Sequence, residues 1–268
     1  MVKIFLCVVV FSVNLFALSA LKVAKHIVND NSKNTKLELL FAKDTYKDAY
    51  GNIDIYTISQ ILKTNSLSNF IFNEPKKLTF SFKAQADAVI FFKIINDTLN
   101  ELGYVYFIPI EFILREDYIT YKLSLDSQYM LDPGIFYKAL LSNLIFIKDI
   151  SKISETHYEY ELDFSKVKAK VNTQVPLNTF VQLQKPLREY MVDLQGAKIL
   201  ELNAHNYDSW FCKIQFLDKN LNFIQSIENT HKQNDVVLNI PLGAKYAIIG
   251  DMFSLDNIKR GLKIYLRR

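Results

Sequence analysis

The residue types best suited to ligand chemistry gather in one short segment, residues 205–210 (HNYDSW). It offers two aromatic rings beside side chains that form hydrogen bonds. Sugar-binding sites use this combination, because the C–H faces of a pyranose stack on aromatic rings while carboxylates and amides bind its hydroxyl groups. Tyr207, Asp208 and Trp210 are therefore candidate ligand-binding residues. The alternative is structural: Trp210 opens a strand and fills the end of a β-sandwich, while Asp208 and Ser209 form the turn.

A second candidate is a possible metal site at His157 and Glu159. Alternate residues of a strand point to the same face, so His157, Glu159, Glu161 and Asp163 share one side. Two ligands spaced in this way could converge on one ion. The simpler interpretation is the solvent-facing side of a half-buried strand. We therefore expect no metal and no cofactor.

Motifs of known catalytic sites are absent from the sequence. It has no Gly-x-Ser-x-Gly elbow, no His-Glu-x-x-His and no Cys-x-x-Cys, and its seven glycines are dispersed rather than gathered in a phosphate-binding loop. Two carboxylates about 5–9 Å apart would suffice for glycoside cleavage, but nothing singles out a pair among the 28 acids. We expect a non-enzymatic protein without catalytic residues.

The first residues predict export. Lys3 gives a positively charged start, residues 4–16 are predominantly apolar, and small residues follow up to Ser19. The apolar run is shorter than the about 20 residues that span a bilayer. We expect a signal peptide over residues 1–19, cleaved after Ser19 or Ala20, a periplasmic location and no integral membrane span after cleavage.

Composition favours a folded protein without nucleic-acid binding. Hydrophobic residues make up 50% of the chain, which is enough for packed cores. The net charge is +4 at pH 7, and loss of the leader, whose one charged residue is Lys3, lowers it to +3. Such a mild, unclustered excess does not indicate a nucleic-acid partner. Cys212 is the one cysteine outside the leader, and its alternation with Trp210 and Ile214 predicts burial.

The elements before residue 166 predict an α+β domain over residues 37–165, preceded by a polar, flexible lead-in over residues 20–36. Strands and amphipathic helices alternate there, with one helix that begins at Asp132-Pro133. The order predicts a ferredoxin-like, split β-α-β domain. The expected elements are a strand at 78–82, a helix at 87–102, strands at 104–114 and 118–125, a helix from 132, and strands at 146–153 and 157–164.

The remaining chain predicts a second domain. Residues 166–176 contain three lysines and end at Pro176, so we expect an exposed linker. Residues 177–268 contain eight short alternating runs, which predict an all-β antiparallel sandwich of the jelly-roll type. Its separate core is expected from alternating residues: Trp210, Ile214, Phe216, Leu238, Ile240, Tyr246, Ile248, Leu262 and Ile264.

Two segments of this region carry a family resemblance. Residues 210–224 (WFCKIQFLDKNLNFI) give a strand, a D-K-N turn and a strand, and residues 237–249 (VLNIPLGAKYAII) give a proline-ended strand that leads into A-K-Y. The pattern resembles the carbohydrate-binding-module type of jelly roll, which implies a sandwich fold and suggests a glycan ligand. The whole chain also resembles exported periplasmic proteins of Gram-negative bacteria.

Taken together, these features predict a non-enzymatic periplasmic protein. We expect it to bind another envelope protein or a cell-wall component as part of an assembly. The alternative is a carbohydrate-binding protein that acts through the C-terminal sandwich.

Overall fold

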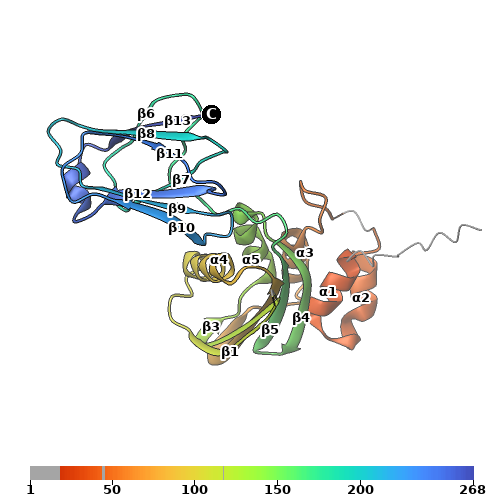
Figure 1. The fold of residues 1–268 in the computed structure, drawn as a ribbon. Helices are drawn as coiled ribbons and strands as arrows, with labels where there is room; N and C mark the ends of the chain where they lie inside the picture. Colours follow the sequence, from red (N-terminus) through yellow and green to blue (C-terminus); the bar gives the residue numbers. More distant parts are fainter. Residues whose placement is uncertain (1–18, 44–45, 117) are drawn as a thin grey trace, which may run out of the picture.

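The computed structural model describes residues 19–43, 46–116 and 118–268, and it has a mixed α/β architecture (Figure 1). The predicted signal peptide lies outside these residues except for Ser19. Within the described ranges, no helix is long and apolar enough to cross a membrane.

The N-terminal half is built on one five-stranded sheet with the order β2-β3-β1-β5-β4. Helices α4 and α5 cover one face of this sheet, α1 lies beside β4, and α2 packs against α1 (Figure 1). The elements are α1 (Ala20–Val28), α2 (Asn34–Leu40), α3 (Ile55–Thr64), β1 (Ile71–Gln85), α4 (Ala88–Glu101), β2 (Ile108–Arg115), β3 (Tyr118–Tyr129), α5 (Pro133–Leu140), β4 (Phe146–Ser154) and β5 (His157–Asp163).

The sheet contains one split β-α-β unit. Strand β3 lies between β1 and β2, so the connection through α4 passes over an antiparallel neighbour. The second helix leads to a different arrangement. The chain leaves α5 for the edge strand β4 and returns as β5, which pairs parallel to β1. The sheet is therefore mixed.

Residues 20–36 differ from the flexible lead-in that their polarity predicts, because they contain α1 and the start of α2. Ala20, Val23, Ala24 and Ile27 recur at helical spacing and are buried. The Ser19 side chain caps the start by accepting a hydrogen bond from the Lys22 amide at 3.2 Å. The apolar stripe of α1 packs into the same core as the sheet.

The C-terminal half contains two four-stranded antiparallel sheets. Their orders are β10-β9-β12-β7 and β11-β8-β13-β6. One apolar cluster takes residues from both sheets, an arrangement compatible with a β-sandwich. The strands are β6 (Val181–Gln182), β7 (Tyr190–Asp193), β8 (Ile199–Ala204), β9 (Cys212–Leu217), β10 (Phe223–Glu228), β11 (Asp235–Asn239), β12 (Tyr246–Asp251) and β13 (Leu262–Arg267).

The core of this half agrees with most of the residues expected from alternation. Trp210, Ile214, Phe216, Leu262 and Ile264 are buried in the shared cluster, and Leu238 and Ile240 pack against it. Cys212 is also buried there, as its alternation predicts. Tyr246 and Ile248 belong instead to the N-terminal core.

The connection between the halves is packed against both of them. Ala169, Thr173 and Val175 are buried, whereas the lysines at 166, 168 and 170 are exposed. The Ala169 amide donates to the Tyr246 hydroxyl at 3.1 Å. Lys170 pairs with Glu101 at the end of α4 at 2.9 Å. Alternate side chains of residues 166–176 are thus held against the two halves.

The Tyr246 hydroxyl predicts a measurable stability change. Tyr246→Phe leaves the buried Ala169 amide without its acceptor, so we expect a loss of about 1–3 kcal/mol in the free energy of unfolding. Urea denaturation measures it. The control Tyr265→Phe, on a half-buried ring of β13, should change stability by less than about 0.5 kcal/mol. Equal, small effects of both substitutions would contradict the assigned hydrogen bond.

Candidate functional site

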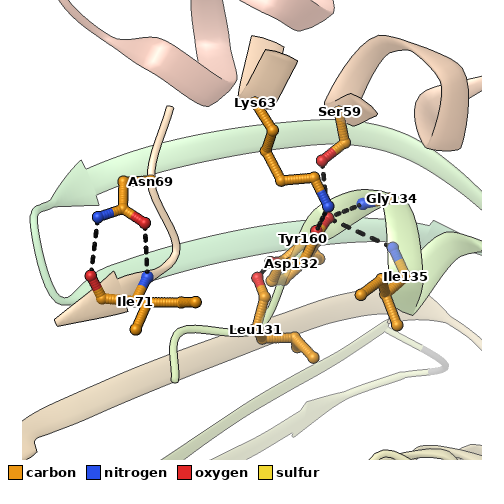
Figure 2. Close-up of polar contacts among 9 residues, drawn as sticks. All are labelled: Ser59, Lys63, Asn69, Ile71, Leu131, Asp132, Gly134, Ile135 and Tyr160. Carbon is orange, nitrogen blue, oxygen red and sulfur yellow. Dashed lines mark hydrogen bonds and ion pairs between the residues drawn. The ribbon is translucent and has the colours of Figure 1, made fainter. Parts of the chain in front are cut away.

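A buried carboxylate, Asp132, joins the end of β3 to helices α3 and α5 (Figure 2). Asp132 is the N-cap of α5, and its Oδ1 accepts from the Gly134 amide at 2.8 Å. The same oxygen accepts from the Ser59 hydroxyl at 2.7 Å, and Oδ2 accepts from the Lys63 ammonium at 2.7 Å. Ser59 and Lys63 are one turn apart on α3, so one carboxylate holds both residues.

The contact between α3 and α5 requires glycine at position 134. A Cβ atom there would lie 2.6 Å from the Cβ of Ser59 and 3.0 Å from the Cα of Tyr56. The Asp-Pro-Gly start of α5 therefore serves two purposes: it caps the helix, and it lets α3 approach closely.

Serine, lysine and aspartate are residue types of nucleophilic active sites. Here Ser59 is 0% exposed and its hydroxyl donates a hydrogen bond to Asp132, so a substrate cannot reach its oxygen. Beside the carboxylate, the buried Tyr160 hydroxyl donates to the Leu131 carbonyl at 2.9 Å. Burial raises the pKa of Tyr160 well above its ordinary value, which keeps it neutral. This arrangement holds elements together and does not support catalysis.

Of the three ligand-binding residues predicted at 207–210, the structure places one on the surface. Tyr207 is 81% exposed. Asp208 is buried and forms an ion pair with Arg260. Trp210 is 0% exposed, and its indole N–H donates to the Gly250 carbonyl at 2.8 Å. A ring without an exposed face cannot stack on a sugar, so the role predicted for Trp210 is wrong. Its burial fits the structural alternative.

His157 and Glu159, the two candidate metal ligands, instead contact side chains of β1. The Nε2 of His157 lies 2.8 Å from the Ser81 hydroxyl, and Glu159 pairs with Lys83 at 2.7 Å. Burial lowers the pKa of His157, which favours its neutral form. Among the described residues, no group of three or more His, Cys, Asp or Glu side chains is placed to hold a metal ion.

A cavity of about 730 Å³ lies beside the end of α1 and the start of β1. Its charged lining is balanced, because Lys33, Lys76 and Lys152 face three acids. Two of these lysines are in ion pairs, Lys33 with Asp30 and Lys76 with Glu155. The lining therefore does not select a ligand of one charge.

An exposed apolar strand is the surface feature that the sequence reasoning missed. Strand β2 lies at one end of the sheet order, and seven of its eight residues are exposed. Apolar side chains occupy both of its faces and continue into the preceding loop, where Tyr106 is 88% exposed. The exposed apolar residues are Val105, Tyr106, Ile108, Ile110, Phe112, Ile113 and Leu114. The near-continuous apolar run in the sequence is consistent with this exposed apolar strand, but it fits a buried strand equally well.

A second surface feature is an aromatic pair on the outer side of the sheet that contains β13. Phe180 stacks on Tyr265 with ring centroids 4.5 Å apart, and the Lys263 ammonium lies 4.4 Å from the Phe180 centroid. Glu201 and Asn203 of β8 are directly opposite Tyr265 and Lys263. The pair thus lies among side chains that form hydrogen bonds.

A scan against protein-family models finds no match, and searches of the curated proteins and of the solved structures find none either. The geometry of the described residues therefore carries the functional interpretation.

Because of its additional links, the cap at Asp132 should contribute more to the free energy of unfolding than an ordinary helix cap. Asp132→Ala removes a cap and leaves the buried Ser59 hydroxyl without an acceptor, so we expect a loss of about 2–4 kcal/mol in the free energy of unfolding. The control is Asp54→Ala, which removes the half-buried cap of α3 and should cost about 1 kcal/mol. Denaturant unfolding compares them. Equal losses would show that the links to Ser59 and Lys63 add nothing.

Proposed function

We propose that this chain is a non-enzymatic periplasmic protein that binds another envelope protein as part of an assembly. The observation that carries the proposal is the exposed apolar edge strand β2. Contiguous exposed apolar surface of this kind marks protein interaction sites. The predicted signal peptide supports the location, because it would deliver the chain to the envelope.

Strand β2 suits a partner that adds a strand to the sheet. An edge strand presents a row of backbone groups toward solvent, and a bound strand pairs with them while its side chains contact the two faces. The usable length is limited at one end. Pro109 has no amide hydrogen, and the pairing with β3 is irregular between Pro109 and Glu111. The regular part of the edge is residues 111–115.

A photo-crosslinking amino acid at position 113 tests the protein-binding role in the native cell. We expect an adduct heavier than the single chain, because Ile113 lies at the centre of the regular edge. The same amino acid at exposed position 148, on the opposite edge strand β4, is the control and should give no adduct. Absence of an adduct at 113, or equal adducts at both positions, would contradict the proposal.

For the two halves we also propose specific folds. The C-terminal half has eight strands, β6 to β13, which we count in chain order. The first, eighth, third and sixth of them form one sheet, and the second, seventh, fourth and fifth form the other. This alternation between sheets supports a jelly roll. The split unit β1-α4-β2 supports a ferredoxin-like relationship for the N-terminal half, with the β4–β5 hairpin as an addition.

The second candidate function is binding of a cell-wall glycan by the C-terminal half. The stacked pair Phe180 and Tyr265 favours it, because Phe180 is half exposed and lies next to the Lys263 ammonium. On the other side of β13, Glu201 and Asn203 lie opposite Tyr265 and Lys263. Aromatic faces with neighbouring polar groups suit sugar rings. The sugar site of this candidate function would lie on the outer face of the sheet.

Co-sedimentation with purified peptidoglycan tests this candidate. The wild type should pellet with the glycan, and Phe180→Ala should weaken retention at least about tenfold, which corresponds to 1.4 kcal/mol. Tyr207→Ala is the control, since Tyr207 is an exposed aromatic residue in another loop, and it should bind like the wild type. Failure of the wild type to pellet, or unchanged retention of Phe180→Ala, would contradict glycan binding at this face.

A further inference from the structure

We propose that the partner of β2 is β2 of a second copy of this chain, paired antiparallel about a two-fold axis at Ile113. The inference rests on the proposed protein-binding role of β2 and names its partner. The two five-stranded sheets would join into one continuous sheet across this axis.

The two edges of the sheet differ in how they are covered. At the β4 edge, side chains of α1 and the residue that ends it contact backbone carbonyls: His26 Nδ1 lies 3.0 Å from the Ile150 oxygen, and the Asn29 amide donates to the Lys152 oxygen at 2.7 Å. The edge is therefore partly capped. At the β2 edge, residues 112–115 are exposed. A strand can add to the sheet at β2 without displacing a helix.

The residues of the regular edge complement themselves. In the order Glu111-Phe112-Ile113-Leu114-Arg115, antiparallel pairing about Ile113 places Glu111 opposite Arg115 of the other copy. Phe112 then faces Leu114, and Ile113 faces Ile113. The two-fold axis repeats each of the unlike pairs. Opposite charges and apolar residues directly across an antiparallel pair stabilise it, whereas like charges oppose it.

These pairs also agree with the faces of the sheet. Glu111 lies opposite Lys122 of β3 and pairs with it at 3.1 Å, so Glu111, Ile113 and Arg115 share the face away from α4. Phe112 lies on the other face, where its ring centroid is 4.9 Å from that of Phe92 on α4. In the pair, Glu111 would lie between Lys122 of its own chain and Arg115 of the second copy.

Other registers lose this complementarity. A slip that centres the axis on Leu114 places Arg115 opposite Ile113 and Phe112 opposite Glu116. A slip that centres it on Phe112 places Glu111 opposite Ile113 and brings Pro109 into the pairing. A register in which the axis falls between two residues would set residues of opposite faces against each other, which the pleat forbids. The charges thus select the register centred on Ile113.

Charge reversal and mixing test the pairing in the purified full chain by analytical ultracentrifugation. The wild type should be dimeric in the micromolar range. Arg115→Glu sets acid opposite acid, and Glu111→Arg sets base opposite base, so each variant alone should dimerise at least about tenfold more weakly. An equal mixture should recover wild-type dimerisation as a heterodimer, because both cross-strand pairs are then oppositely charged. Lys148→Glu, on β4, is the control and should dimerise like the wild type.

The mixture separates a pairing defect from a folding defect. Glu111→Arg also loses its ion pair with Lys122, and a folding defect from that loss would persist in the mixture, so urea unfolding of each variant is measured in parallel. A monomeric wild type, unchanged dimerisation of both variants, or no recovery on mixing would overturn the self-pairing. An adduct at position 113 with a different protein, together with a monomeric wild type, would overturn self-pairing while the protein-binding role stands. A monomer without any adduct at 113 would contradict both.

Discussion

The N-terminal half depends on the buried carboxylate of Asp132. It receives an amide of α5, the hydroxyl of Ser59 and the ammonium of Lys63, so one side chain fixes the end of β3 and the relative position of two helices. A buried charge is stable only when its hydrogen bonds and its counter-ion are in place. The close approach at Gly134 supplies that geometry. The same constraint removes Ser59 from solvent, which is why a set of residues suited to catalysis acts here as a structural link.

The two halves share a boundary that is partly apolar and partly polar. Leu217, Leu221 and Tyr246 of the C-terminal half are buried in the N-terminal core. Asn222 donates to the Asp87 carboxylate, which caps α4, at 3.0 Å. The alternately buried residues of 166–176 add to this contact. Apolar burial across such a boundary couples the stability of the halves, although each has a cluster of its own.

Periodicity in the sequence was enough to predict the local elements but not their neighbours. Local physical causes underlie the predicted strand at 78–82, the apolar stripe of α4 and the Asp132-Pro133 start of α5, and the structure has those elements. The parallel pairing of β1 with β5 depends on residues far apart in the chain. The same limit applies to the sites: Trp210 alternates like a core residue and is one, whereas the exposure of β2 follows from its terminal place in the sheet. The apolar residues of helix α1 recur at helical spacing and could have predicted it, but the polar residues between them made the segment look like a flexible lead-in.

Helix α1 bears on the proposed assembly as well as on the core. If both edges of the sheet were open, β2 of one copy would be free to pair with β4 of the next, and such a head-to-tail contact propagates into a filament. His26 and Asn29 contact carbonyls along β4 and so obstruct that route. Pro109 and the irregular pairing beside it restrict the open edge to five residues. An apolar edge strand is ordinarily an aggregation hazard. Because the β4 edge is partly capped and the charges of β2 favour one register, β2 instead favours an assembly that closes at two copies.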